Sequence, residues 1–280
     1  MKFKLGCYLD YDISSDSTFI FNIRPIANDY QTILEQRLKI SPDYEPENYL
    51  EQNRQNSYFR LNVPTGNLTI DYQATVELSH HADSIDEINE IPPSQLPLEV
   101  IPYLYPSRYC QSDRLMKFAQ DEFGNCKPGH AKVQAICDWI YHKIDYVSGS
   151  SDSQTSAYDT AIERAGVCRD FAHLGIAFCR ALSIPARFVS AYAWQLDPPD
   201  FHACFEAYLG DRWYLFDATR LAPTNGLVRI GTGRDAADAA FATVFGAIAL
   251  NKMDVYIDRL DDSGKSESED TAYATTSSRS

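Results

Sequence analysis

The period of the hydrophobic residues changes along this chain, and that change limits the folds that the chain can adopt. In the first 80 residues, apolar and aromatic side chains occur in short runs that alternate with polar ones. A period of two places alternate side chains on one face of a strand. The runs are separated by turn residues such as Thr65-Gly66. The sequence therefore predicts an antiparallel β-domain over residues 1–80, with strands near 4–11, 18–24, 58–63 and 68–77.

The period then lengthens to that of an α-helix. Apolar residues recur every three or four positions from Ala131 to Ile144 and again from Phe171 to Leu182, which predicts two buried helices. The second helix must end before Pro185, because a proline disfavours helical backbone in the residue before it. Three strand-like runs follow, at 186–194, 201–209 and 212–217. Helices followed by antiparallel strands indicate an α+β domain, which we place at residues 97–260.

Two segments have neither pattern. Residues 81–96 are polar and acidic and contain several prolines, and proline interrupts both helices and central strands. We therefore predict a linker there. Residues 261–280 are rich in serine, threonine and acidic side chains and contain almost nothing apolar. Such a composition cannot bury a core, so we predict a disordered tail over this range.

The charge and the cysteines exclude several kinds of protein. The 280 residues carry 25 Lys and Arg against 39 Asp and Glu, a net charge of −14. Without a basic surplus we expect neither a nucleic acid nor a membrane as partner. No apolar signal core or long apolar stretch occurs, so we predict a cytoplasmic protein.

Seven cysteines in a chain of this length are expected to be free thiols. Nothing in the sequence predicts an oligomeric state.

One cysteine stands where a helix is predicted to begin. Cys168 follows Gly166-Val167 and precedes the apolar helical pattern. Unsatisfied N–H groups and the positive end of the helix dipole favour a thiolate at such a position. An isolated cysteine is more commonly a small buried hydrophobic residue. A catalytic role for Cys168 therefore requires a base.

His202 is the best-placed base. His173 lies five positions after Cys168, about 140° around the helix, and cannot face the thiol. His202 begins the predicted strand 201–209, and Asp217 ends the next strand. Two hairpin registers around Gly210-Asp211 put both side chains on one face, either diagonal or directly opposite. In both, a carboxylate beside the imidazole fixes its orientation and tautomer, as a base that activates a thiol requires.

Four ordered motifs resemble those of the bacterial branch of the transglutaminase-like superfamily. They are Gly-Val-Cys-Arg-Asp-Phe-Ala-His-Leu (166–174), Ile-Pro-Ala-Arg-Phe-Val-Ser-Ala-Tyr (184–192), Phe-His-Ala (201–203) and Trp-Tyr-Leu-Phe-Asp-Ala-Thr-Arg (213–220). The resemblance extends from about Pro97 to Asp258, and the early strands resemble the β-domain that often precedes that core. It implies a papain-like catalytic domain in which Cys168 is the nucleophile, His202 the base and Asp217 its orienter. It requires no metal or cofactor.

The chain departs from the family pattern at two positions beside the predicted triad. Cys204 stands where the family commonly has tryptophan, and Ala218 where it commonly has proline. Neither departure removes a member of the triad. The first weakens any inference about the shape of the substrate channel.

Two other motifs are weaker. The segment Gly231–Ala236 matches the G-x-G-x-x-A of dinucleotide-binding folds, but too few residues follow it to build the required βαβ units. Within it we expect Asp235 to cap a helix rather than to line the site. Cys126, His130, Cys137 and His142 have cysteine-histidine spacings that suggest zinc, but five positions separate the last two and turn them apart on a helix.

The predicted chemistry is acyl transfer through a thioester. A thiolate at Cys168 attacks an amide carbonyl of a peptide or protein substrate, and the imidazolium protonates the leaving nitrogen. We expect a cysteine peptidase or amidase. The alternatives are a protein-glutamine transglutaminase, in which an amine replaces water, and a catalytically silent peptide- or protein-binding module. Tyr146, Gln154 and Tyr158 are candidates for a second oxyanion donor that the sequence does not distinguish.

Overall fold

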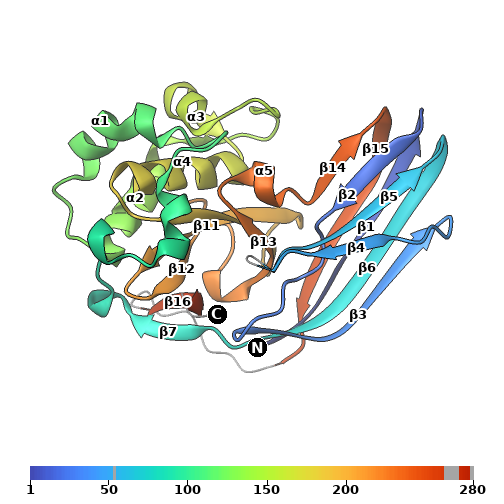
Figure 1. Ribbon diagram of the computed structural model, residues 1–280, viewed down its shortest axis with the longest axis horizontal. Helices are drawn as coiled ribbons and strands as arrows, with labels where there is room; N and C mark the ends of the chain where they lie inside the picture. Colours follow the sequence, from blue (N-terminus) through green and yellow to red (C-terminus); the bar gives the residue numbers. More distant parts are fainter. Residues whose placement is uncertain (53–54, 262–270, 278–280) are drawn as a thin grey trace.

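The computed structural model describes residues 1–52, 55–261 and 271–277. Figure 1 shows two parts side by side, a β-sandwich and a part in which helices cover one face of a sheet. The α+β prediction is confirmed. Among the described helices none is long and apolar enough to cross a membrane. A cytoplasmic location stays a prediction.

The sandwich consists of two antiparallel sheets. The predicted strands are present as β1 (Lys2–Ile13), β2 (Ser17–Phe21), β5 (Ser57–Val63) and β6 (Gly66–Leu78). The first sheet has the order β15-β1-β6-β3 and the second β14-β2-β5-β4. Along β6 every second residue from Leu68 to Leu78 is buried, so one face of that strand packs in the core. The remaining strands are β3 (Gln31–Ser41), β4 (Glu47–Leu50), β14 (Ala242–Phe245) and β15 (Ile248–Arg259).

The sandwich therefore includes residues that the sequence assigned to the second domain. β15 pairs with β1 from Arg259↔Phe3 to Ile248↔Ile13, and β14 pairs with β2. The prediction of one α+β domain over residues 97–260 differs from the structure here, because residues 242–259 complete both sheets of the sandwich. The pairing covers an edge of β1 that would otherwise present unpaired backbone groups.

The second part is built around one buried helix. α4 (Cys168–Ala181) packs on β11 (Phe201–Leu209), with Gly175 so close to the Phe205 ring that a Cβ would lie 2.6 Å from it. The six-stranded sheet has the order β13-β10-β11-β12-β16-β7. The predicted helix over 131–144 is α2 (His130–Lys143). The other elements are α1 (Ser112–Phe123), β8 (Asp145–Tyr146), α3 (Ala157–Glu163), β9 (Ala165–Gly166), β10 (Ala186–Ala193), β12 (Arg212–Phe216), β13 (Leu227–Gly233) and α5 (Ala236–Ala239).

The predicted linker and tail both contribute strands to this sheet. β7 (His81–Ser84) precedes 3₁₀ turns at Ile85–Glu87, Pro93–Gln95 and Leu98–Leu104. β16 (Thr271–Ser277) pairs with β12 on one side and β7 on the other. The prediction of a disordered tail differs from the structure over 271–277, and 262–270 and 278–280 lie outside the described residues. Buried Ala272 and Ala274, and a hydrogen bond from Thr275 to buried Glu206, explain why this polar segment is ordered.

Buried amide side chains join the two parts. Gln31 of β3 donates through its amide to the carbonyl of Arg229 at 2.8 Å and accepts from the Arg229 N–H at 2.8 Å. The Asn56 amide likewise donates to the carbonyl of Thr232 and accepts from the Thr232 N–H, each at 2.8 Å. Both partners lie on β13, at the edge of the six-stranded sheet. These paired bonds satisfy backbone groups that would otherwise be buried without partners.

Candidate active site

Cys168 is the first residue of α4. Asp170, fully buried, accepts a hydrogen bond from the Val167 N–H at 2.9 Å, which closes the first turn in the manner of a capping box. A Cβ at Gly166 would lie 2.7 Å from the Asp170 side chain, so glycine is needed there. Cys168 itself is half-buried. This half-buried cysteine therefore lies at the N-terminal, positive end of the α4 dipole.

His202 and Asp217 form a buried pair. His202 Nε2 lies 2.8 Å from Asp217 Oδ2, and each side chain is at most 2% exposed. Of the two predicted registers, the structure has the one in which Phe205 opposes Phe216, which makes His202 and Asp217 diagonal neighbours. The Thr219 N–H and hydroxyl donate to Asp217 Oδ1 at 2.9 and 2.7 Å. Both carboxylate oxygens therefore have partners, and alanine at 218 leaves this arrangement intact.

The pair is a salt bridge at neutral pH. Burial lowers the pKa of His202, but the charge and hydrogen bond of Asp217, and a hydrogen bond with Cys168, outweigh burial and raise that pKa to about 10. Burial raises the pKa of Asp217, but the charge and hydrogen bond of His202, together with the hydrogen bonds of Thr219, lower it by more. The net shift of this pKa is therefore downward. Because Nε2 faces Asp217, the other ring nitrogen is left for Cys168. The structure thus brings all three predicted site residues together.

Tyr146 also reaches Cys168. The two-residue strands β8 and β9 pair in parallel, with Tyr146 beside Gly166. Its hydroxyl interacts with both the backbone N–H and the side chain of Cys168. Burial, the charge of Cys168 and, more weakly, the charge of Asp200 raise the pKa of Tyr146 to about 12, so it is a neutral donor at physiological pH. The other two oxyanion candidates lie elsewhere: Gln154 is exposed, and Tyr158 packs under Arg114.

Asp200 contributes a negative charge at the mouth of the site. It lies on the surface two residues before His202 and accepts from the Phe201 N–H at 2.7 Å. Partial desolvation raises its pKa. Within the described ranges no Lys or Arg forms an ion pair with Asp200. The charge of this carboxylate is therefore available to a cationic group of a substrate.

The weaker motifs have structural roles. His173 is buried, stacks on Tyr109 at 5.0 Å and accepts from the Ala236 N–H. Asp235 caps α5, as predicted, by accepting from the Ala237 N–H at 3.0 Å. Gly231 and Gly233 lie inside β13, which pairs with β10 and is not a phosphate-binding turn. Among the residues that the structure describes, no three histidines, cysteines or acids are grouped to hold a metal ion.

Comparison with known proteins agrees with this arrangement. Residues 101–218 match the family model of the transglutaminase-like superfamily, and residues 1–99 match that of the bacterial transglutaminase N-terminal domain. A crystal structure of a protein from Cytophaga hutchinsonii, proposed to be a cysteine protease, is 47% identical and superimposes with a TM-score of 0.95 over 98% of this chain and 97% of that one. The chain belongs to the transglutaminase-like superfamily.

Proteins similar to this chain occur in mycobacteria. An uncharacterized protein of Mycobacterium leprae is 26% identical over 265 residues, which cover 89% of this chain and 94% of that protein. An uncharacterized protein of Mycobacterium tuberculosis is 30% identical over 142 residues, 45% of each chain. The fold is thus the transglutaminase-like, papain-like fold with a preceding β-domain, as the sequence motifs implied.

Proposed function

We propose that this protein is a cysteine peptidase or amidase that cleaves amide bonds of a peptide or protein through a thioester on Cys168. One observation carries the proposal: a single imidazole, His202, connects a buried carboxylate with the cysteine at the start of α4. This is the arrangement in which a base activates a thiol and is itself oriented by a third group. The similar protein from Cytophaga hutchinsonii, proposed to be a cysteine protease, supports the same reaction class.

Each residue of the site has its own role in the proposed reaction. His202, whose pKa is raised to about 10, already holds the proton of the Cys168 thiol as an imidazolium, which leaves the sulfur as a thiolate beside it. The thiolate attacks the substrate carbonyl carbon, and negative charge develops on the carbonyl oxygen. The Cys168 N–H and the Tyr146 hydroxyl donate to that oxygen. The imidazolium then gives its proton to the leaving nitrogen, which departs and leaves a thioester. His202, now neutral, takes a proton from a water molecule whose oxygen attacks the thioester carbon. The C–S bond breaks, the carboxylic acid product leaves, and the Cys168 thiolate is regenerated beside the imidazolium.

A transglutaminase is the second candidate. Its thioester is attacked by a primary amine in place of water. The carboxylate of Asp200 is compatible with this function, because it lies beside the site without a Lys or Arg partner among the described residues and would attract an ammonium group. The same charge would equally attract a lysine or arginine side chain within a cleaved peptide. Hydrolysis remains the first proposal because water is always present at an open site.

A peptide library separates these functions. The protein is incubated with mixed peptides, with and without a primary amine, and the products are measured by mass spectrometry. We expect cleavage or deamidation in both incubations. A product mass that contains the amine would instead establish transamidation. Unchanged peptides in both incubations, with Cys168 alkylated no faster than the other cysteines, would contradict catalysis and indicate a binding module.

Replacement of Tyr146 by phenylalanine tests the oxyanion donor. The substitution removes one hydroxyl beside Cys168 and keeps the ring, so we expect kcat to fall about 100-fold with little change in KM. Steady-state kinetics on a cleaved peptide measure both parameters. Tyr105→Phe, at an exposed position on the surface, is the matched control and should keep full activity. An unchanged kcat in Tyr146→Phe would show that another group holds the oxyanion.

A further inference from the structure

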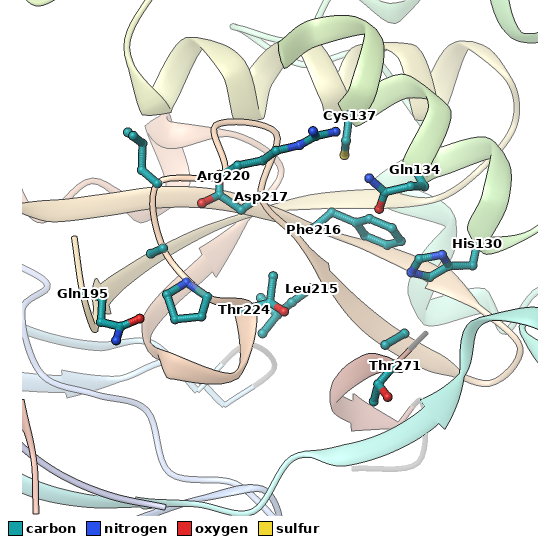
Figure 2. Close-up of a pocket in the computed structure, with 14 residues that line it drawn as sticks. His130, Gln134, Cys137, Gln195, Leu215, Phe216, Asp217, Arg220, Thr224 and Thr271 are labelled. Atoms are coloured by element: carbon teal, nitrogen blue, oxygen red, sulfur yellow. The ribbon is translucent and has the colours of Figure 1, made fainter. Parts of the chain in front are cut away.

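A cavity lies beside the triad, on the side of Asp217. Its volume is about 510 Å³, within the usual range of small-molecule sites. Asp217 contributes to its wall, whereas Cys168 and His202 are not among its lining residues, so the cavity lies on the Asp217 side of the triad. Figure 2 shows the space enclosed by α2, the end of β12, the loop that follows β12, and β16. The lining residues that matter for its chemistry are His130, Gln134, Leu215, Phe216, Asp217 and Arg220.

The cavity exists because two strands separate. β16 pairs with β12 as far as Ala274 opposite Tyr214. Its first residues, Thr271 and Ala272, pair instead with β7 on the other side. The end of β12, Leu215 and Phe216, therefore faces the cavity where the sheet would otherwise continue.

Polar groups point into this space from α2. The side chain of His130 is directed into the cavity, with its ring 4.8 Å from that of Phe216 (Figure 2). His130 is only 7% exposed, yet in the part of the chain that the structure describes no hydrogen bond to its ring nitrogens occurs. Gln134, one turn later, donates to Asp138 at 2.8 Å and directs its carbonyl oxygen into the cavity. Buried polar groups in native proteins normally have partners, so the unpartnered ring of His130 indicates an absent one, and the half-buried Gln134 offers a second polar group beside it.

The charges at the cavity are balanced. Burial lowers the pKa of His130 to about 4, so the ring is neutral at physiological pH. Arg220 is paired with Asp138, and its guanidinium also lies 4.3 Å above the Tyr141 ring. Asp217 is paired with His202. Among the lining residues that the structure describes, a charged ligand would find no free counter-charge and would lose its hydration, so an uncharged ligand is favoured.

We propose that this cavity binds a small uncharged molecule that carries an amide or hydroxyl group beside an apolar body. The amide or hydroxyl satisfies His130 and Gln134, and the apolar body covers Leu215 and Phe216. Such a ligand also contacts the loop after β12, where Thr219 holds Asp217. The binding does not depend on the proposed function. If the protein is the proposed hydrolase, occupancy of the cavity changes its turnover through the position of Asp217.

Benzamide and benzoate form a matched pair of probes, since they share a shape and differ in charge. Each is titrated into Cys168→Ala protein with ¹³C-labelled histidine rings, so that no turnover occurs, and the ring signals are followed by NMR. Loss of one signal in His130→Gln, and of another in His202→Gln, assigns the two residues. We expect benzamide to shift the His130 signal saturably and benzoate to bind at least tenfold more weakly.

Two variants distinguish this cavity from other sites. Gln134→Leu should weaken benzamide binding at least tenfold, whereas Gln120→Leu, the same change at an exposed position on α1, should not alter it. No shift of the His130 signal, equal binding of benzoate, or unchanged binding in Gln134→Leu would overturn the proposal. A shift of the His202 signal alone would also overturn it, because the probe would then bind beside His202 and not beside His130. None of these readouts requires enzymatic activity, so failure of the proposed function would leave them interpretable.

Discussion

Replacing Cys168 by alanine abolishes amide cleavage, with an expected loss in kcat of about a millionfold, which leaves only background hydrolysis. The thioester cannot form without the sulfur, and neither the helix dipole nor His202 supplies another nucleophile. The fold should persist, because the first turn of α4 is closed by Asp170 through the Val167 N–H and not by the thiol. Peptide cleavage measured by mass spectrometry, together with the midpoint of thermal unfolding, tests both statements.

Cys126→Ala is the matched control for this prediction. Cys126 is also half-buried, but it lies between α1 and α2, outside the elements that carry the triad. It should keep full activity. The two variants should also differ in alkylation at pH 6–7: one fast-reacting site disappears in Cys168→Ala and stays in Cys126→Ala. Cleavage that survives in Cys168→Ala would assign the reaction to another residue and would remove the basis of the proposed function.

The elements that carry the triad could be predicted from the sequence because their signals are local. α4 has an apolar period from Phe171 to Leu182, and β11 and β12 are runs of strand-forming residues around a two-residue turn. The turn also decided the register that the sequence left open. Gly210 and Asp211 both have positive φ, of 52° and 83°, as a type I′ hairpin requires. That turn places Leu209 opposite Arg212 and so fixes the diagonal relation of His202 and Asp217.

The parts that could not be predicted depend on partners distant in sequence. β15 is largely exposed and pairs with β1 across more than 230 residues, and no local pattern identifies that partner. β16 has small buried residues, Ala272 and Ala274, within a polar composition that is typical of disorder. Tyr146 reaches Cys168 through a strand of two residues, which is too short to show a period. Pairing across the chain, rather than composition, orders these segments.

Asp217→Asn should reduce kcat about 10⁴-fold, the second largest effect that we expect. The asparagine amide is of similar size, so the hydrogen bonds of Thr219 and the packing of β12 can remain. It cannot stabilise a protonated His202, however, and it can select the wrong tautomer of the ring. Kinetics on a cleaved peptide measure the loss. Asp211→Asn, at the exposed hairpin turn, is the matched control and should leave kcat unchanged.

The same substitution should change how stability depends on pH. His202 has a folded-state pKa of about 10 against an ordinary value of 6.5, so its pairing stabilises the fold fully below pH 6.5. That contribution is lost as the pH rises towards 10, because the unfolded chain has already released the proton. Asp217→Asn removes the main cause of the raised pKa and should flatten this decline. Urea unfolding at pH 6, 7.5, 9 and 10 measures the free energy of unfolding of both proteins. The other titrating groups are the same in both, so the difference between the two pH profiles reports on His202. Parallel declines in the two proteins would show that His202 is not held as an imidazolium by Asp217, and the proposed proton transfers would then need another base.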